Sequence, residues 1–366
     1  MNIFIMALEP LDSRYTGQWF HGIPKLLYEH ATNRGQYVNI ENIAGDTISG
    51  ETSEGAFLNF TATNVWKNSQ VSKLAEMFSD GTVKPGDKIL FTDAWHSGII
   101  QVKYMSELTG VPVEIHSMWH AGSYDPADFL GRKIADKRWA YSAERSFFFA
   151  SDYNYFATEF HRDMFLNTLF SPESVTDGLF LRPEAEKTVI SGQPYNELAE
   201  LLPQYRGAKR DLIVFPHRLA PEKQPEIFRD LAASMPEYEW VITQENKLNK
   251  DEYYRLLGQA KIVFSANLQE TLGVSSVMEP CHLDIIPLVP DRLCYSEIYR
   301  DYEDFLYPSS WSTNWDAYIA NKAEVVAMIR YTMENYDHLM DKVVHFRGNV
   351  WPRYGNADVM VKNLLA

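Results

Sequence analysis

Short apolar runs alternate along the chain with longer stretches in which apolar residues recur at helical spacing. A short run that ends in turn residues is typical of a buried strand, and the longer stretches are typical of amphipathic helices. Strands that alternate with helices predict a parallel sheet covered by helices on both faces. We therefore expect an α/β fold of the doubly wound kind.

The predicted elements fall into two series. The first series has strands at residues 2–7, 37–40, 88–92, 111–116 and 153–158, and helices at 19–34, 71–79, 99–109, 137–146 and 159–169. The second has strands at 212–215, 240–243 and 261–265, a further strand within 280–290, and helices at 221–233, 251–260 and 315–336. Between the two series, residues 170–204 are rich in Pro, Ser and Gly, which favours a linker.

The length of the chain supports two domains. A chain of 366 residues is long for one domain and sufficient for two separate cores. We expect a Rossmann-like N-terminal domain over residues 1–190 and a second Rossmann-like domain over residues 191–350. Ligands of such sheets bind beyond the carboxyl ends of the strands, so we expect the chemistry to lie there.

Charge and composition exclude several classes. The net charge of -15 argues against general electrostatic attraction to nucleic acid or to an anionic membrane. The first residues lack the basic lead and cleavage site of a signal peptide, and no apolar run approaches the roughly 18 residues of a membrane span. Two cysteines, Cys281 and Cys294, predict neither a disulfide framework nor a metal site. We expect a cytoplasmic protein that has no membrane partner.

The most informative segment, residues 215–224, reads FPHRLAPEKQ and carries Arg218 and Lys223 just after a predicted strand. A helix predicted to begin at Pro221 would present free N–H groups and a partial positive charge, which favour an anion. An arginine adds a bidentate fork and a lysine adds a mobile point charge. Together these groups suit a diphosphate.

The pattern Arg-Leu-x-Pro-Glu-Lys at residues 218–223 resembles the diphosphate motif of retaining GT-B glycosyltransferases of the glycogen synthase type, which are family 4-like enzymes. The resemblance implies two Rossmann-like domains that face each other across a cleft. It also implies that the C-terminal helix, residues 351–366, crosses back to the first domain. Arg218 and Lys223 would then neutralise the diphosphate of a nucleoside-diphosphate sugar, with a UDP-sugar as the expected donor.

A second motif follows the strand predicted at residues 261–265. Residues 267–279 read NLQETLGVSSVME and are similar to the paired-glutamate signature of the same family. In that family the first Glu lies near the donor sugar, a Gly-led turn opens a helix under the phosphates, and the second Glu takes the ribose hydroxyls. The resemblance therefore assigns donor binding to a set of five residues: Glu270, which would also be catalytic, Thr271, Leu272, Gly273 and Glu279.

The spacing of the two glutamates departs from the family. Eight residues separate Glu270 from Glu279, where the family has seven. Either a one-residue bulge absorbs the extra position, or Glu279 is displaced and only Glu270 is functional. In the second case Glu279 would be a solvated helix residue.

Histidines of the first domain complete the resemblance. Residues 111–124 look like the family's strand followed by a histidine that contacts the transferring sugar, which makes His116 the second catalytic candidate. His120 lies four positions further on and would face the acceptor, while His96 is expected to line the cleft. One glycine in the opening loop, Gly17, is a further candidate for close backbone approach to the donor.

The mechanism that the resemblance implies is transfer of a sugar to a hydroxyl with retention at the anomeric carbon. The transition state is oxocarbenium-like, and negative charge builds up on the departing diphosphate. No acidic residue lies at the position that a covalent nucleophile would require. No Asp-x-Asp triplet occurs either, so the sequence does not support a metal-dependent GT-A enzyme. We therefore expect neither a cofactor nor a required metal.

A local basic cluster suggests the acceptor. Four basic residues and two aromatic residues fall within residues 131–141, and the basic ones are Arg132, Lys133, Lys137 and Arg138. Cations with interleaved rings suit a polyanion that carries bases. We therefore expect an acceptor such as a 5-hydroxymethylated pyrimidine in phage DNA, in which case the enzyme would act in the host cytoplasm. A solvated helix face is the other interpretation of the cluster.

Other functions stay open. The acceptor would equally be a saccharide or a small metabolite. A UDP-sugar 2-epimerase shares the two-domain fold and needs no acceptor, and a catalytically silent GT-B interaction subunit would account for the irregular glutamate spacing. A P-loop kinase and a Rossmann dehydrogenase are disfavoured because neither Gly-x-x-x-x-Gly-Lys nor Gly-x-Gly-x-x-Gly occurs.

Overall fold

The computed structural model describes residues 1–11, 15–48, 59–171 and 187–366. The chain divides into two compact units, of which the first takes residues 1–157, 161–194 and 357–366 and the second takes residues 158–160 and 195–356. Each unit has its own parallel sheet and its own apolar core.

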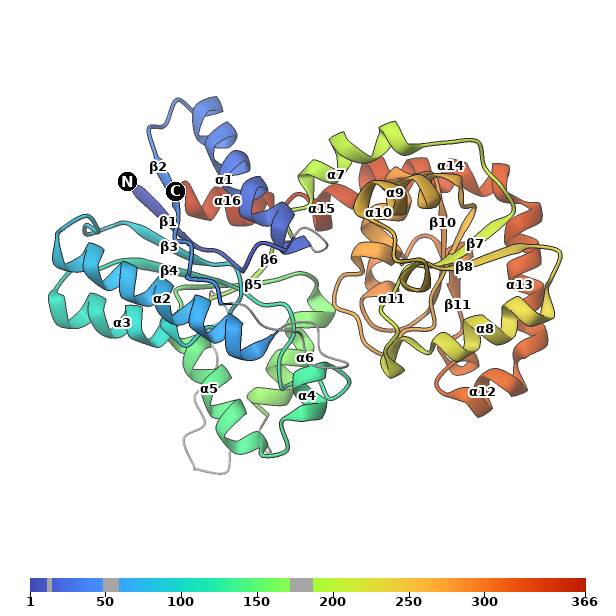
Figure 1. Ribbon diagram of the computed structural model, residues 1–366, viewed down its shortest axis with the longest axis horizontal. Helices are drawn as coiled ribbons and strands as arrows, with labels where there is room; N and C mark the ends of the chain where they lie inside the picture. The colour runs from blue at the N-terminus through green and yellow to red at the C-terminus, as the bar shows by residue number, and fades with distance from the viewer. Residues whose placement is uncertain (12–14, 49–58, 172–186) are drawn as a thin grey trace. The chain divides into compact units, whose positions relative to one another are not determined.

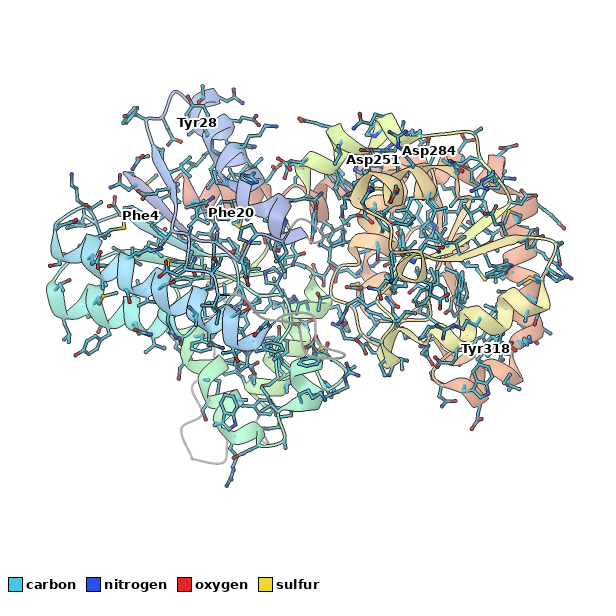
Figure 2. All side chains as sticks on the ribbon, viewed as in Figure 1. Phe4, Phe20, Tyr28, Asp251, Asp284 and Tyr318 are labelled. Atoms are coloured by element: carbon cyan, nitrogen blue, oxygen red, sulfur yellow. The ribbon has the colours of Figure 1, made fainter. Side chains whose placement is uncertain are left out.

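The first unit is built on a six-stranded parallel sheet in the order β2-β1-β3-β4-β5-β6. The strands are β1 Asn2–Met6, β2 Asn39–Asn42, β3 Lys88–Phe91, β4 Glu114–Met118, β5 Tyr153–Phe156 and β6 Thr188–Ile190. Strands β1 and β3 are apolar almost throughout, as strands covered on both faces require. Phe4 of β1, labelled in Figure 2, is fully buried.

Helices cover both faces of this sheet. Their bounds are α1 Tyr15–Asn33, α2 Phe60–Ser79, α3 Gly98–Thr109, α4 Phe129–Lys133, α5 Lys137–Ala150, α6 Glu159–Leu169 and α16 Asp358–Leu364. Helices α1 and α16 pack together on one face, whereas α2, α3 and α5 pack in sequence on the other (Figure 1). The C-terminal helix is therefore part of the first unit.

The second unit is built on a five-stranded sheet in the order β11-β10-β9-β7-β8, which is also parallel. The strands are β7 Leu212–Phe215, β8 Glu239–Ile242, β9 Ile262–Phe264, β10 Ile286–Pro290 and β11 Leu306–Tyr307. The chain runs from β7 to β8 on one side and then to β9 on the other side of β7. Such a reversal opens a crevice at the carboxyl ends of the strands, where α/β sheets bind ligands.

The helices of the second unit also form two layers. Their bounds are α7 Asn196–Leu201, α8 Pro225–Ser234, α9 Lys250–Gln259, α10 Glu279–His282, α11 Cys294–Ile298, α12 Trp315–Ala320, α13 Lys322–Glu334, α14 Tyr336–Asn349 and α15 Trp351–Gly355. Helices α8, α12 and α13 share one face, where Tyr318 (Figure 2) donates to Asp230 at 2.6 Å. Across the described ranges, no helix is both long enough and apolar enough to cross a bilayer.

Two expectations about the elements are wrong. Within the predicted linker, residues 188–190 form β6 and residues 196–201 form α7, and a strand of three residues is too short to show a period. Residues 172–186 of that segment lie outside the described residues. Helix α2 begins at Phe60, well before residue 71, because Asn59 caps it by accepting from Thr61 and Ala62.

The helix predicted to begin at Pro221 begins at Pro225 instead. Pro221 opens a single 3-10 turn that ends at Lys223, and Gln224 then takes a left-handed conformation with φ 51°. A residue before proline is disfavoured in the α region, so Gln224 cannot continue a helix into Pro225. The second proline therefore sets the start of α8.

Candidate functional site

Two loops meet at the carboxyl edge of the second sheet. Residues 216–224 follow β7 and residues 265–273 follow β9, and these two strands are neighbours in the sheet. Leu268 N donates to Glu222 O at 2.8 Å, which joins the loops through their backbones. This edge is the position at which open α/β sheets bind ligands.

The loops place Lys223 beside Glu270. The lysine is only 5% exposed, and its Nζ lies 3.3 Å from Glu270 Oε2 and also donates to Gln269 O. A cation that is removed from water requires a partner of opposite charge or hydrogen-bond acceptors. The structure therefore brings two of the predicted donor-binding residues together in one ion pair.

Arg218 lies on the same loop with more of its surface exposed. Its side chain is 37% exposed, and its Nη2 donates to Glu222 Oε1 at 3.2 Å. Because α8 begins only at Pro225, Arg218 and Lys223 lie on the loop and its 3-10 turn. The expectation that these two cations flank the N-terminus of a helix that begins at Pro221 is therefore wrong, because that helix begins at Pro225.

Buried polar side chains hold the loop after β9 in place. Arg292 donates from Nε to Asn267 O at 2.7 Å and from Nη2 to Ala266 O at 2.8 Å. Gln224 Nε2 donates to Ala266 O at 2.6 Å. Carbonyl groups that have left the strand ladder are thus paired, which fixes the path of the chain toward Glu270.

Gly273 opens the helix that follows this loop. Its φ is +84°, and a Cβ built on it would lie 2.7 Å from Ser276 Oγ. Only glycine combines a left-handed φ with so little room. The first N–H groups of a helix have no partner within the helix, so the turn after Gly273 presents donors at the site.

A π turn at residues 274–278 contains the extra residue between the two glutamates. Met278 N donates to Gly273 O at 3.1 Å, and Glu279 N donates to Val274 O, as in i→i+5 pairing. A π turn inserts one residue into a helix without ending it. The predicted one-residue bulge is therefore present.

Glu279 is buried, and two side chains of α9 contact its carboxylate. It is 3% exposed, its Oε2 accepts from Tyr253 Oη at 2.6 Å, and its Oε1 lies 3.7 Å from Lys250 Nζ. The interpretation of Glu279 as a solvated helix residue is therefore wrong. The neighbouring Thr271 and Leu272 are also buried, and Thr271 O accepts from Thr158 Oγ1 at 3.0 Å.

In the first unit, His116 does not lie where the sequence predicts. Strand β4 runs to Met118, so His116 lies in its middle and is fully buried. Its Nδ1 is 2.8 Å from Tyr155 Oη and its Nε2 is 2.7 Å from Glu114 Oε1. The hydrogen bond from His116 lowers the pKa of Glu114 to about 2. The expectation that His116 follows the strand and reaches a ligand is wrong, because the ring pairs within the sheet.

His120 occupies the end-of-strand position instead. Its Nε2 lies 2.6 Å from Thr92 O, and because a carbonyl only accepts, this nitrogen must carry the proton. Nδ1 is then the acceptor for Gln193 Nε2 at 3.2 Å. The ring also lies 5.0 Å from that of Trp19. These contacts fix the orientation of the His120 ring at the carboxyl edge of β4.

His96, expected to line a cleft, is buried in the first unit. It is 2% exposed, its Nδ1 accepts from Gly98 N at 3.0 Å, and its Nε2 then donates to Gln70 Oε1 at 3.2 Å. Burial lowers the pKa of His96 to about 3, so the ring is neutral at physiological pH. The side chain joins the start of α3 to α2. The expected role for His96 is therefore wrong.

The remaining predicted residues lie at the junction of α4 and α5 and in the first turn of α1. Arg132 and Lys133 are exposed at the end of α4, Lys137 donates to Gly131 O, and Arg138 pairs with Asp136 at 3.1 Å. The exposed cations therefore lie together at the α4–α5 junction. The expected opening loop around Gly17 is wrong in part, because α1 begins at Tyr15 and includes Gly17 in its first turn.

Sequence reasoning missed a charged network beside His120. Lys67 Nζ lies 2.7 Å from Asp93 Oδ2, and both side chains are mostly buried. Burial raises the pKa of Asp93, but the charges of Lys67 and His120 outweigh it, so that the pKa is lowered. Glu144 is also buried nearby. Its signal was in the sequence, since it shares the buried face of α5 with Ala140 and Phe147.

Comparisons with known proteins establish the fold. No family model matches the sequence, and no curated protein matches it. Solved structures do match: *Anabaena* Alr3699/HepE in complex with UDP is 9% identical with a TM-score of 0.57, and 100% of this chain and 98% of that chain are covered. A glycosyltransferase from *Rickettsia africae* ESF-5 is 12% identical with a TM-score of 0.57, covering 100% and 96%.

The catalytic domain of starch synthase IV from *Arabidopsis thaliana*, bound to ADP and acarbose, is 12% identical with a TM-score of 0.56, covering 100% and 98%. These similarities extend over whole chains at low identity, and they show the fold alone. The chain has the GT-B fold, with two Rossmann-like units. The predicted fold class is confirmed.

The conformation of Gly273 generates the first testable prediction. Gly273→Ala should lower the free energy of unfolding by about 1–2 kcal/mol, because alanine is strained in the left-handed region. The turn that follows should also shift, because Ser276 must move. Gly348→Ala is the matched control, since a Cβ at Gly348 meets nothing within 4 Å. Urea unfolding measures the first effect and hydrogen exchange of the amides of residues 274–278 measures the second, and equal behaviour of the two variants would contradict the account of the turn.

Proposed function

We propose that the chain is a glycosyltransferase that moves a sugar from a UDP-sugar to a hydroxyl group with retention of anomeric configuration. The observation that carries the proposal is the ion pair between the buried Lys223 and Glu270, which joins the loops after β7 and β9. Arg218 lies on the loop after β7, as Lys223 does. Three of the solved structures with this fold support it, since two HepE complexes contain UDP or UDP-glucose and starch synthase IV contains ADP.

The two cations, Arg218 and Lys223, stabilise the leaving group. As the glycosidic bond breaks, negative charge builds up on the diphosphate, and preorganised donors stabilise it most when they need not reorganise. Lys223 is already fixed by Gln269 and Glu270, and Arg218 is a partly exposed cation on the loop after β7. The N–H groups that follow Gly273 add a third source of positive potential.

The two glutamates bind the sugar and the ribose of the donor. Glu270 is 20% exposed at its side chain, so it is placed to contact the sugar while it orients Lys223. Each carboxylate oxygen of Glu279 keeps a lone pair beyond its contact with Tyr253 or Lys250, and these accept the ribose hydroxyls. On the first unit, His120 occupies the end-of-strand position that the sequence had assigned to His116.

The acceptor we propose is DNA that carries 5-hydroxymethylated pyrimidines. The surface that supports it is the α4–α5 junction, where Arg132, Lys133 and Arg138 are exposed beside Trp139, which is 52% exposed. Cations contact phosphates, and an exposed ring stacks on a base. A saccharide or a small metabolite is the other acceptor class.

One experiment decides among the functions. The chain is offered a panel of UDP- and GDP-sugars with and without hydroxymethylated DNA, and products are identified by mass spectrometry. Sugar attached to DNA supports the proposal as stated, and sugar attached to another hydroxyl supports only transfer. Interconversion of UDP-sugars without an acceptor would identify an epimerase, and no turnover in any mixture would contradict an enzymatic role.

Arg218→Ala tests the leaving-group assignment. The variant should fold normally because the side chain is partly exposed, while kcat should fall by about 10²–10³-fold with the loss of one donor to the developing charge. Arg229→Ala is the matched control, since Arg229 is an exposed cation paired with Glu245 in the same unit. Steady-state kinetics of both variants give the answer, and near-normal turnover by Arg218→Ala would refute the assignment.

Chelation tests the source of positive charge. We expect activity to survive EDTA, because Arg218, Lys223 and a helix N-terminus stabilise the diphosphate without a metal. Initial rates are measured after dialysis against EDTA and after addition of magnesium or manganese. Complete loss of activity that manganese restores would show that the diphosphate is held in another way.

The acceptor assignment is tested by alanine at the four basic positions of the junction, Arg132, Lys133, Lys137 and Arg138. DNA binding should weaken and its salt dependence should flatten, since each lost phosphate contact removes about one unit from the log–log slope. The KM for the donor should hardly change, because the diphosphate loops belong to the second unit.

The control for this variant removes four lysines elsewhere on the first unit, namely Lys25, Lys73, Lys84 and Lys103. Both variants lose the same charge, so a general electrostatic effect would appear in both. An unchanged acceptor KM and salt slope in the junction variant would refute the nucleic-acid assignment and leave sugar transfer untouched.

A further inference from the structure

A fully buried carboxylate on α5 connects two loops of the first unit. Glu144 is 0% exposed, and its Oε1 accepts from Trp95 Nε1 at 2.8 Å and from Ser123 N at 2.6 Å. Its Oε2 accepts from Ser123 Oγ at 2.8 Å. Trp95 belongs to the loop after β3 and Ser123 to the loop after β4, so one side chain bonds to both.

The second loop passes close to this carboxylate at Gly122. A Cβ at Gly122 would lie 2.4 Å from Glu144 Oε1, so the loop passes the carboxylate as closely as a backbone can. Ser123 contributes both its backbone and its side chain to the contact. The loop is therefore bonded to α5 through both groups of Ser123.

The two loops carry the polar groups at the carboxyl edge of the first sheet. Trp95 N donates to Asp93 Oδ1 at 3.0 Å, and Lys67 Nζ binds both Asp93 Oδ2 and Trp95 O. Fixing Trp95 therefore fixes Asp93. Ser123 lies three residues after His120, whose Nε2–H is directed at Thr92 O at the start of the other loop.

We propose that Glu144 is a positioning residue that holds the Asp93 loop and the His120 loop in register for the transfer reaction. The inference rests on the proposed function, because it assumes that these loops serve catalysis. Burying a carboxylate opposes folding by several kcal/mol unless its hydrogen bonds compensate, so an apolar residue would serve a purely structural role at least as well. Unlike an apolar residue, the carboxylate accepts three directional hydrogen bonds, and these fix the orientation of two loops.

The carboxyl group also titrates in the physiological range. Burial raises the pKa of Glu144 to about 7, although the hydrogen bonds from Ser123 and Trp95 and the charge of Lys137 lower it. The charge of Glu144 acts on Tyr124 and Tyr141, and the charges of Asp93, Asp125 and Asp128 also act on Tyr124. Below pH 7 the proton lies on Oε2 and the Ser123 hydroxyl becomes its acceptor, so the heavy atoms need not move.

The sign of the pH effect follows from the raised pKa. Between the usual value of 4.5 and about 7, the folded protein binds more protons than the unfolded chain. The stabilisation from this group is therefore complete below 4.5 and is lost as the pH rises through 7. The hydrogen bonds between Glu144 and the two loops instead become stronger as the pH rises, because hydrogen bonds to an ionised carboxylate are about twice as strong as neutral ones.

Glu144→Gln is the central test. The amide keeps the shape and an acceptor for Trp95 and Ser123 N, but it has no charge. We expect kcat to fall about tenfold at pH 8, and the wild-type limb that rises through about pH 7 should be absent from the variant. Below pH 6 the two proteins should have similar rates. UDP affinity, measured by calorimetry, should stay within about twofold, because the diphosphate loops belong to the second unit.

Two further variants separate positioning from folding. Trp95→Phe removes one donor and keeps a ring, and its effect on kcat should be smaller in the Glu144→Gln background than in the wild type. Glu107→Gln, an exposed Glu→Gln change on α3, should leave the rate and the pH profile unchanged. Additive effects of the first pair, or a uniform loss of rate at every pH that follows the folded fraction, would overturn the proposal.

Hydrogen exchange provides a readout that does not depend on activity. In Glu144→Gln, amides of residues 92–98 and 119–128 should exchange faster together at pH 8, while those of the second unit should not change. If the wild-type protein transfers no sugar but both loops respond together, the proposed function fails and the coupling stands. If only one loop responds, or neither, Glu144 does not hold the two in register and the inference is overturned.

Discussion

The ion pair between Lys223 and Glu270 is the interaction on which the candidate donor site depends. A lysine that is 5% exposed cannot keep its charge without a partner, and its partners come from the loop of the neighbouring strand. The pair therefore ties the loop after β7 to the loop after β9. A parallel sheet makes this possible, because it delivers the carboxyl ends of adjacent strands to the same edge. Arg292 and Gln224 bond to carbonyl groups of the loop after β9, which keeps the partners of Lys223 in place. The positive charge is therefore already positioned before a ligand binds.

The π turn shows how one inserted residue is accommodated without loss of the helix. An insertion in a regular α-helix rotates every later side chain by about 100°, which would carry Glu279 away from Tyr253. Confining the extra residue to residues 274–278 keeps Glu279 buried against α9. Gly273 is the residue at which this helix starts, and its positive φ permits the close approach of Ser276.

The sequence predicts the two series of strands and helices well, because apolar period and turn residues are local signals. It predicts the closeness of Lys223 and Glu270 only through a resemblance, since the contact joins loops 47 positions apart. His116 was misplaced because the apolar run at residues 111–116 does not show that β4 extends to Met118. Asp93, Lys67 and Glu144 were missed because their pairing depends on how α2 and α5 pack on the sheet. Glu144 alone left a local signal, as a charged residue on an apolar helix face.

The central claim is that the second unit binds a nucleoside diphosphate through its diphosphate. Calorimetric titration of uridine, UMP and UDP into the wild-type protein and into Lys223→Met tests it most directly. The account predicts that affinity rises steeply from UMP to UDP in the wild type, and that Lys223→Met binds the two nucleotides with nearly equal affinity. UDP that binds no more tightly than uridine to the wild-type protein would contradict it.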